Sequence, residues 1–177
     1  MDIKSFRKYG HELVDWVADY MGSVEDYPVM SRAKPGEVRA ALPMDPPRKG
    51  EKMNEIIGDL DRIVMPGITH WQHPGFFAYF PANTSGPSIL AELVSAALGV
   101  NAMVWQTSPA ATELEEVVME WLRRMLDLPD EFKGVIQDTA SVSAVCALLA
   151  ARERLSGFLI NEKGFPEWPA GEAMRIY

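Results

Sequence analysis

The sequence is poor in several residue types, and each shortage excludes a class of protein. Cys146 is the one cysteine among 177 residues, so the chain cannot form an internal disulfide or supply a cysteine-rich zinc site. Positive charge is also scarce, because 17 Lys and Arg stand against 25 Asp and Glu and the net charge is −8. A chain this acidic does not attract nucleic acid or anionic lipid. We expect a reducing, cytoplasmic setting and neither nucleic acid nor a membrane as a partner.

Long apolar runs are absent as well. The longest uninterrupted apolar stretch covers residues 144–151, far short of the roughly 20 residues that span a bilayer. Residues 1–8 mix charged and apolar side chains and lack the apolar region of a signal peptide. With 47% hydrophobic and 24% charged residues, the composition is that of an ordinary globular chain.

Apolar residues recur at helical spacing in two early segments. The first predicted helix covers 6–21, and the second covers 53–64 and ends at Pro66 and Gly67. The connector between them is too rich in proline for a long helix or a central strand. Because this connector cannot enclose a core, we expect both apolar stripes to need a partner surface.

Start and stop signals predict three more helices. One follows Ser85-Gly86-Pro87 and ends before Gly99, and a second starts at Ser108-Pro109 and ends near Met125. The third covers 142–154 and follows the short apolar run 134–137, which we interpret as a strand; 175–177 resembles the start of another. A lone strand buried between helices would leave its edges unpaired, so the sheet it belongs to is largely missing and the pattern predicts the front part of a larger α/β protein.

The small polar turn 138–141 is a candidate anion site. It places Thr139 and Ser141 at the start of a predicted helix, where free amides and the helix dipole favour a phosphate. The alternative is that Asp138 or Thr139 simply caps the helix.

An aromatic segment at 70–81 is the second candidate site. Five aromatic residues fall between positions 71 and 80, in a segment with poor helical spacing and with prolines. They could form a pocket wall for a planar ligand, or a hydrophobic plug under a loop. Packed or hydrogen-bonded roles for His70 and His73 are favoured over metal ligation, because no cysteine or carboxylate accompanies them. We predict no metal site.

Two other groups are given structural roles. Glu113, Glu115 and Glu116 are interpreted as a solvated first helical turn with no catalytic function. Cys146 lies among Ala and Leu, as an inert buried thiol does.

Three segments together carry a family resemblance. They are 69–74 with 76–81, then Trp105 with 108–115, and finally 134–137 with 139–141 and 147–152. The chain resembles the group II pyridoxal-phosphate decarboxylases, and among them most closely the aromatic-L-amino-acid decarboxylases. The resemblance implies a fold-type I α/β enzyme, here with residues 1–84 as an N-terminal helical arm and dimerisation segment. Residues 85–177 would be the beginning of the large pyridoxal-phosphate domain, which is truncated.

The resemblance also implies roles for particular residues. Thr139, Ala140 and Ser141 match the turn that holds the cofactor phosphate, although Asp138 and Thr139 stand where many animal members have Gly and Ser. The positions that match the substrate pocket are Trp71, Tyr79, Phe80, Pro81, Ala82, Asn101 and Met103. Asn101 and Met103 would reach into the pocket of the other subunit of a homodimer, and they are less aromatic than a catechol or indole pocket requires.

The chemistry of this family also needs a lysine bonded to the cofactor, an acidic residue beside the pyridine nitrogen and a histidine stacked on the ring. In the family all three come after the position that matches Tyr177. We therefore expect no catalytic residue in this chain, and an inactive fragment of an enzyme that converts aromatic L-amino acids to amines and CO2. The alternatives are a decarboxylase of acidic amino acids or histidine, an aldehyde-forming relative, and a noncatalytic dimerisation fragment.

Overall fold

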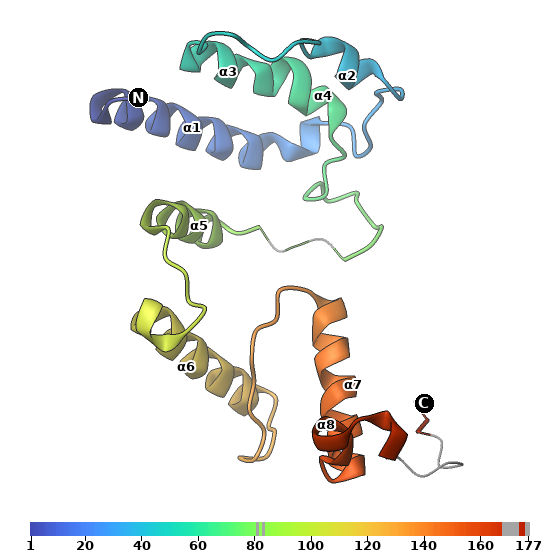
Figure 1. The fold of residues 1–177 in the computed structure, drawn as a ribbon. Coiled ribbons are helices and arrows are strands. Elements are labelled where there is room, and N and C mark those ends of the chain that lie inside the picture. Colours follow the sequence, from blue (N-terminus) through green and yellow to red (C-terminus); the bar gives the residue numbers. More distant parts are fainter. Residues whose placement is uncertain (81, 83, 168–173, 176–177) are drawn as a thin grey trace. The chain divides into compact units, whose positions relative to one another are not determined.

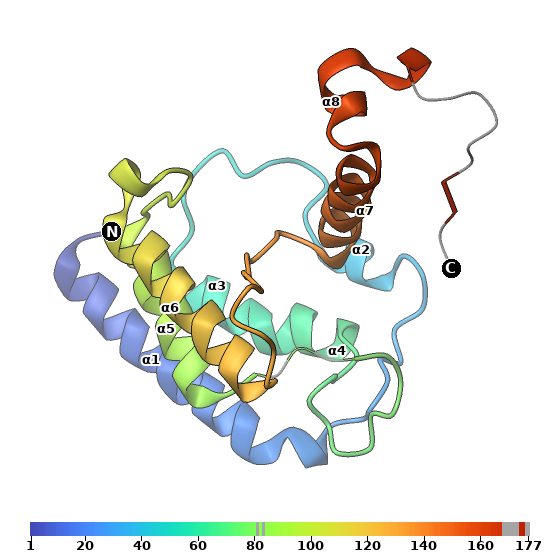
Figure 2. The ribbon, with the colours of Figure 1, turned by 90° about the horizontal axis from the view of Figure 1, so that it is seen from below.

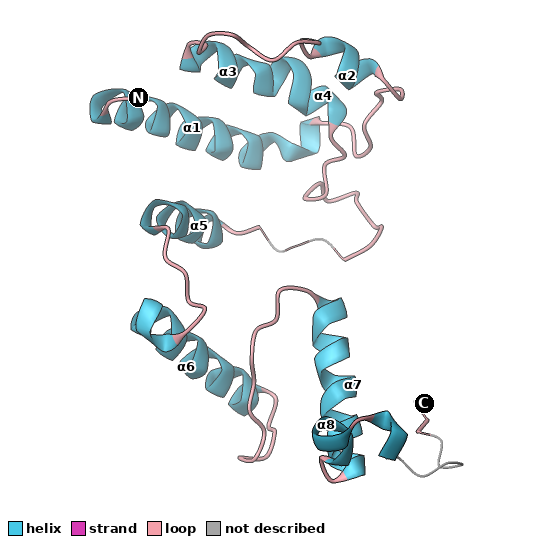
Figure 3. Cartoon of the chain, viewed as in Figure 1, coloured by secondary structure: helices cyan, strands magenta, loops and turns pink. Residues whose placement is uncertain are grey.

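The computed structural model describes all residues except 81, 83, 168–173 and 176–177. Every regular element in these described residues is a helix (Figure 3). The chain divides into two units, Met1–Leu93 and Val94–Tyr177, which are described separately (Figure 1).

The first unit is built on one long helix and several short ones. Its elements are α1 (Ile3–Ser23), the 3-10 turn η1 (Val24–Asp26), α2 (Glu37–Ala41), α3 (Met53–Asp59), the π turn η2 (Leu60–Val64), α4 (Met65–Gly67) and the first turns of α5 (Gly86–Leu98). The helices predicted over 6–21 and 53–64 are confirmed, and the second ends at Gly67 as its Pro-Gly signal predicts. Asp2 caps α1, since its carboxylate accepts a hydrogen bond from the Ser5 amide at 2.9 Å. That bond lowers the pKa of Asp2.

One face of α1 is covered by the first unit itself. The Trp16 indole donates to the Asp61 carboxylate at 2.9 Å, and the Tyr20 hydroxyl lies 3.0 Å from Nδ1 of His70. Ile63, Met65 and His70 are buried beneath these contacts, and α1 lies beside α3 (Figure 1). The expectation that the arm encloses no core is therefore wrong for this face, because the end of the second helix and the following loop fold back onto α1.

The other face of α1 remains open. Figure 2 shows α1 and the start of α5 side by side. They border a groove of about 880 Å³ that is lined mainly by apolar side chains, among them Phe6, Leu13, Val17, Met53, Leu90 and Leu93. Within the described residues, this apolar face of α1 stays accessible.

The second unit contains the remaining helices. They are η3 (Trp105–Thr107), α6 (Pro109–Met125), α7 (Ala140–Ser156), α8 (Leu159–Lys163) and η4 (Phe165–Glu167). The predicted starts and ends hold: Ser108 caps α6 through the Ala111 amide, and Gly99 (φ 58°) follows the end of α5. At the other end of α6, Arg123 donates to Glu120 and to the Leu128 carbonyl. Hydrogen bonds from Arg123 and Arg124 lower the pKa of Glu120 to about 2.

The strand predicted at 134–137 does not form. The described residues contain no strand, and 134–137 runs as an irregular segment along α6. The physical reason is that a strand needs a neighbour to pair its amides and carbonyls, and none of the described segments offers one. The second predicted strand, 175–177, includes Ile176 and Tyr177, which lie outside the described residues.

Helix α7 confirms the helix predicted at 142–154 but is hardly buried. Its apolar residues Val142, Val145, Leu148 and Leu149 are all exposed, and so is Cys146. The prediction of a buried thiol is therefore wrong for the chain by itself. Among the helices of the described residues, none has both the length and the apolar character needed to cross a bilayer.

Candidate functional site

The turn before α7 has the geometry of an anion site. Thr139 is the N-cap, and its hydroxyl accepts from the Val142 amide at 3.2 Å while its carbonyl accepts from Ser143. The amides of Ala140 and Ser141 make no hydrogen bond within the described part of the chain, and neither does the Ser141 hydroxyl. These donors at the positive end of a 17-residue helix fit a phosphate group. The cap and the anion site are thus compatible, because Thr139 uses a different amide from the free ones.

The segment that leads into this turn is held along α6. The Ile136 amide donates to the Glu115 carboxylate at 2.8 Å, and a Cβ on Gly134 would lie 3.0 Å from the Met119 sulfur. One helical turn separates Glu115 from Met119, so 134–136 follows the helix surface. Glu113 in turn accepts from the Trp105 indole at 2.9 Å. The interpretation of the three glutamates as solvated and noncatalytic stays a prediction, and the structure adds that Glu113 and Glu115 accept hydrogen bonds from Trp105 and Ile136.

We predict that Glu115→Ala loosens this segment. Loss of a net hydrogen bond of about 1 to 1.5 kcal/mol corresponds to roughly fivefold to tenfold faster amide exchange at Ile136. Hydrogen-exchange mass spectrometry on peptides covering 134–139 measures this rate. Glu116→Ala is the matched control, since Glu116 makes no such bond in the described residues, and equal rates in both variants would contradict the prediction.

The aromatic segment forms a stack of three rings. The Trp71 ring stacks on Phe76, at a centroid distance of 5.1 Å, and on Tyr79, at 5.6 Å, with interplanar angles of 24° and 13°. We call these three rings the aromatic wall. Tyr79 has a positive φ of 59°, which side-chain-bearing residues rarely adopt. Tyr79 is nonetheless 80% exposed and Trp71 45% exposed, so this side of the wall is an open surface and not a plug under a loop.

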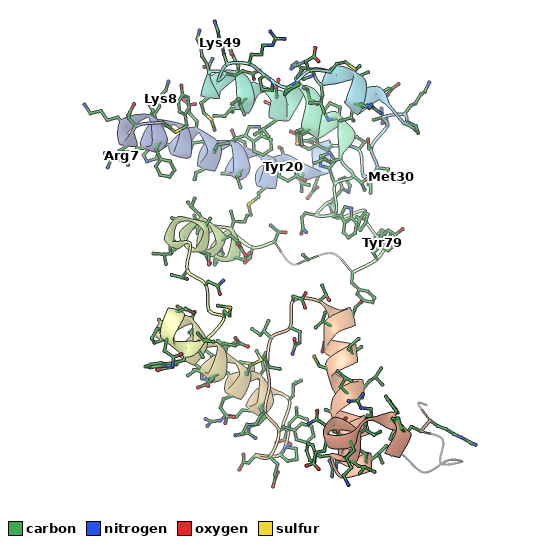
Figure 4. All side chains as sticks on the ribbon, viewed as in Figure 1. Arg7, Lys8, Tyr20, Met30, Lys49 and Tyr79 are labelled. Carbon is green, nitrogen blue, oxygen red and sulfur yellow. The ribbon has the colours of Figure 1, made fainter. Side chains whose placement is uncertain are left out.

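A hydrogen bond joins the two ends of the loop that carries this wall. The Gln72 amide group donates to the Ala82 carbonyl at 2.7 Å, which brings Ala82 back to the beginning of the segment. Phe80 is fully exposed, and Pro81 lies outside the described residues. Figure 4 labels Tyr79 and shows its side chain as sticks.

His70 has a packing role beside the wall. It is 1% exposed, stacks on Tyr27 at 4.8 Å and lies within hydrogen-bond distance of the Tyr20 hydroxyl. Burial, with a smaller effect of His73, lowers the pKa of His70, and burial raises the pKa of Tyr20. No group of three His, Cys, Asp or Glu side chains in the described residues is arranged to hold a metal.

The remaining candidate residues belong to the second unit. The Asn101 side chain accepts from the Met103 amide at 2.8 Å, and both side chains are exposed. The structure thus brings together Trp71 with Tyr79, Asn101 with Met103, and Thr139 with the donors of Ala140 and Ser141. The first pair lies in one unit and the other groups in the second.

Sequence reasoning missed Glu115 and the contacts of His70. Their partners are 21 and 50 residues away, so no local spacing connects them. The available signal was one of composition: a carboxylate within an amphipathic helix and a histidine beside an aromatic run.

Known proteins are similar to this chain in sequence and in fold. Residues 35–163 match the pyridoxal-dependent decarboxylase conserved domain. Phenylacetaldehyde synthase of Arabidopsis thaliana is 43% identical over 161 residues, and aromatic-L-amino-acid decarboxylase of Rattus norvegicus is 45% identical over 163 residues; each match covers 88% of this chain. The crystal structure of Oryza sativa TDC with PLP and tryptamine superposes with a TM-score of 0.80 at 36% identity, covering 89% of this chain and 36% of that one.

The match to the conserved domain, which covers most of the chain, defines the class as that of pyridoxal-dependent decarboxylases. The chain belongs to the pyridoxal-dependent decarboxylase family. It spans about a third of the length of the curated relatives it matches, 33% of the plant synthase and 34% of the rat decarboxylase.

Proposed function

We propose that the protein carrying this chain is a pyridoxal-phosphate-dependent decarboxylase that converts aromatic L-amino acids to amines and CO2. The observation that carries the proposal is the turn before α7, where two free amides and a hydroxyl meet the positive end of a helix. Membership of the family supports pyridoxal phosphate as the group whose phosphate binds there. The sequence identity to aromatic-L-amino-acid decarboxylase supports aromatic L-amino acids as the substrate class.

In this proposal the chain's own residues bind and orient. Thr139 keeps the first turn of α7 in place, while the amides of Ala140 and Ser141 and the Ser141 hydroxyl hold the phosphate. When bound, the cofactor supplies a ring that accepts the electron pair left on the α-carbon as CO2 departs. Trp71, Tyr79, Phe80, Pro81 and Ala82 border the substrate, whose aromatic ring matches the flat faces of the aromatic wall.

The proposed enzyme is a homodimer with a shared pocket. Residues 1–84 form the arm that packs on the other subunit, and 85–177 begin a fold-type I α/β domain. Asn101 and Met103, both exposed here, reach the pocket of the neighbouring subunit. The open groove along α1 supports this, because an apolar face of that size is normally covered. We place the enzyme in the cytoplasm.

The lysine that bonds the cofactor lies outside these residues in our proposal. All seven lysines of the chain are exposed. None has the buried surroundings that activate a lysine amine. We therefore expect residues 1–177 alone to be inactive and to bind pyridoxal phosphate weakly or not at all.

An aldehyde-forming enzyme is the second candidate, and the identity to phenylacetaldehyde synthase favours it. Acidic amino acids or histidine are alternative substrates, and a noncatalytic dimerisation segment is an alternative role.

One experiment separates these candidates: the protein that carries this chain is loaded with pyridoxal phosphate and given Trp, Tyr, Phe, Glu or His labelled at the carboxyl carbon. We expect labelled CO2 and an amine from the aromatic substrates. Aldehyde as the product supports the second candidate, and CO2 from Glu or His alone contradicts the aromatic assignment.

A further inference from the structure

His70, Tyr20 and Tyr27 form a cluster that the catalytic proposal does not use. The imidazole stacks on the Tyr27 ring with an interplanar angle of 22°, and its Nδ1 lies 3.0 Å from the Tyr20 hydroxyl. The His70 amide also donates to the Val29 carbonyl at 2.9 Å. These contacts join α1, the segment after η1 and the loop after α4, three parts of the first unit. We call the three side chains the clasp.

The clasp is connected to the aromatic wall by short, fixed steps. His70 precedes Trp71 directly, and two successive turns follow, with the His73 amide bonded to the His70 carbonyl and the Phe76 amide to the His73 carbonyl. Phe76 then stacks on Trp71. The position of His70 therefore determines where this end of the wall begins.

The clasp is suited to a neutral imidazole. His70 is 1% exposed, and the groups that face it are Tyr20 from α1, Tyr27 from the segment after η1 and His73 from its own loop. None of the carboxylates in the described residues bonds to it. A buried imidazolium without a carboxylate is costly, because the charge loses its hydration and gains no counterion.

We propose that the clasp of Tyr20, Tyr27 and His70 positions the aromatic wall, and that it holds while His70 is neutral and opens when His70 is protonated. Burial lowers the pKa of His70 below its usual 6.5. The unfolded or opened state therefore binds the proton more readily than the closed one. The stabilisation from the clasp is fully present above about pH 6.5 and is lost as the pH falls through the lowered pKa.

The role of the wall as a substrate surface rests on the proposed function, whereas the clasp and its response to pH do not. The test therefore uses no substrate. The protein that carries this chain is labelled with 5-fluorotryptophan, and the fluorine resonance of Trp71 is assigned by its loss in Trp71→Phe. The resonance is then followed from pH 8 to pH 5.

We expect the Trp71 resonance to shift with a midpoint below 6.5. The shift should be absent in His70→Gln, which is neutral throughout, and retained in His11→Gln, which removes a histidine of α1 that lies outside the clasp. In Tyr20→Phe, which keeps the imidazole and the ring stack, the resonance at pH 8 should already lie toward the low-pH position of the wild type. That variant provides the test if His70→Gln does not fold.

A Trp71 resonance that is independent of pH, a shift that persists in His70→Gln, or a Tyr20→Phe resonance unchanged at pH 8 overturns the proposal. A separate measurement of KM for an aromatic substrate between pH 8 and pH 5 tests the substrate pocket. A fluorine shift without a change in KM contradicts the pocket role of the wall and leaves the clasp in place.

Discussion

Residues 1–177 on their own are expected to self-associate in solution. The structure exposes 15075 Å², whereas a compact monomer of 19.7 kDa exposes about 8,600 Å² and two separately compact halves about 10,400 Å² in total. Much of the excess is apolar, including the groove along α1 and the sides of α6 and α7. Apolar surface of this extent is normally covered in a stable protein. When the rest of the protein is not there to cover it, copies of the chain are expected to pack their apolar surfaces against one another.

Light scattering measures this association directly. The groove contributes to it, so Phe6→Glu combined with Leu90→Glu should lower the average mass. Met44→Glu is the control, because Met44 is also apolar and is even more exposed but lies in the connector outside the groove. A monodisperse monomer with a cooperative thermal transition would contradict the prediction and the dimer proposal with it.

Ser141→Ala is expected to weaken cofactor binding in the protein that carries this chain. The hydroxyl would donate a hydrogen bond to a charged phosphate, and such a bond contributes about 1.5 to 3 kcal/mol, or roughly 10- to 150-fold in Kd. Equilibrium dialysis against pyridoxal phosphate measures the change. Ser143→Ala removes the same atom two residues further along α7 and should leave the Kd unchanged. Equal affinities in the two variants would remove Ser141 from the phosphate site.

Local signals predicted the helices well. Ser108-Pro109 marks the start of α6 because the serine side chain accepts from an unpaired amide of the first turn, and proline at this position has no amide to leave unpaired. Thr139 likewise caps α7 with its side chain, so the start of that helix could be predicted from the order of residue types, while the anion site at this turn stays a prediction. Such features depend on residues within one turn of each other.

Features that depend on distant partners could not be predicted. The run 134–137 has the composition of a strand, but a strand forms only where another segment pairs with it. Here the Ile136 amide instead donates a hydrogen bond to the Glu115 carboxylate on α6. The apolar stripe of α1 indicated a buried face without showing that Trp16 and Tyr20 pack internally while Phe6 stays in an open groove. Periodicity shows that a face is apolar and not what covers it.

The substrate residues illustrate the same limit. Trp71 and Tyr79 are close enough in sequence for their stacking to follow from one loop. Asn101 and Met103 are tied to each other by a hydrogen bond, but their role in a pocket depends on a second subunit. Their assignment therefore remains a prediction from the resemblance.

The most direct measurement is a crystal structure of the protein that carries this chain with pyridoxal phosphate bound. The central claim is that the turn before α7 holds the phosphate. We predict phosphate oxygens within hydrogen-bond distance of the Ala140 and Ser141 amides and of the Ser141 hydroxyl, with Thr139 still capping the helix. A phosphate bound elsewhere, with these three donors making no contact to the cofactor, would contradict the account.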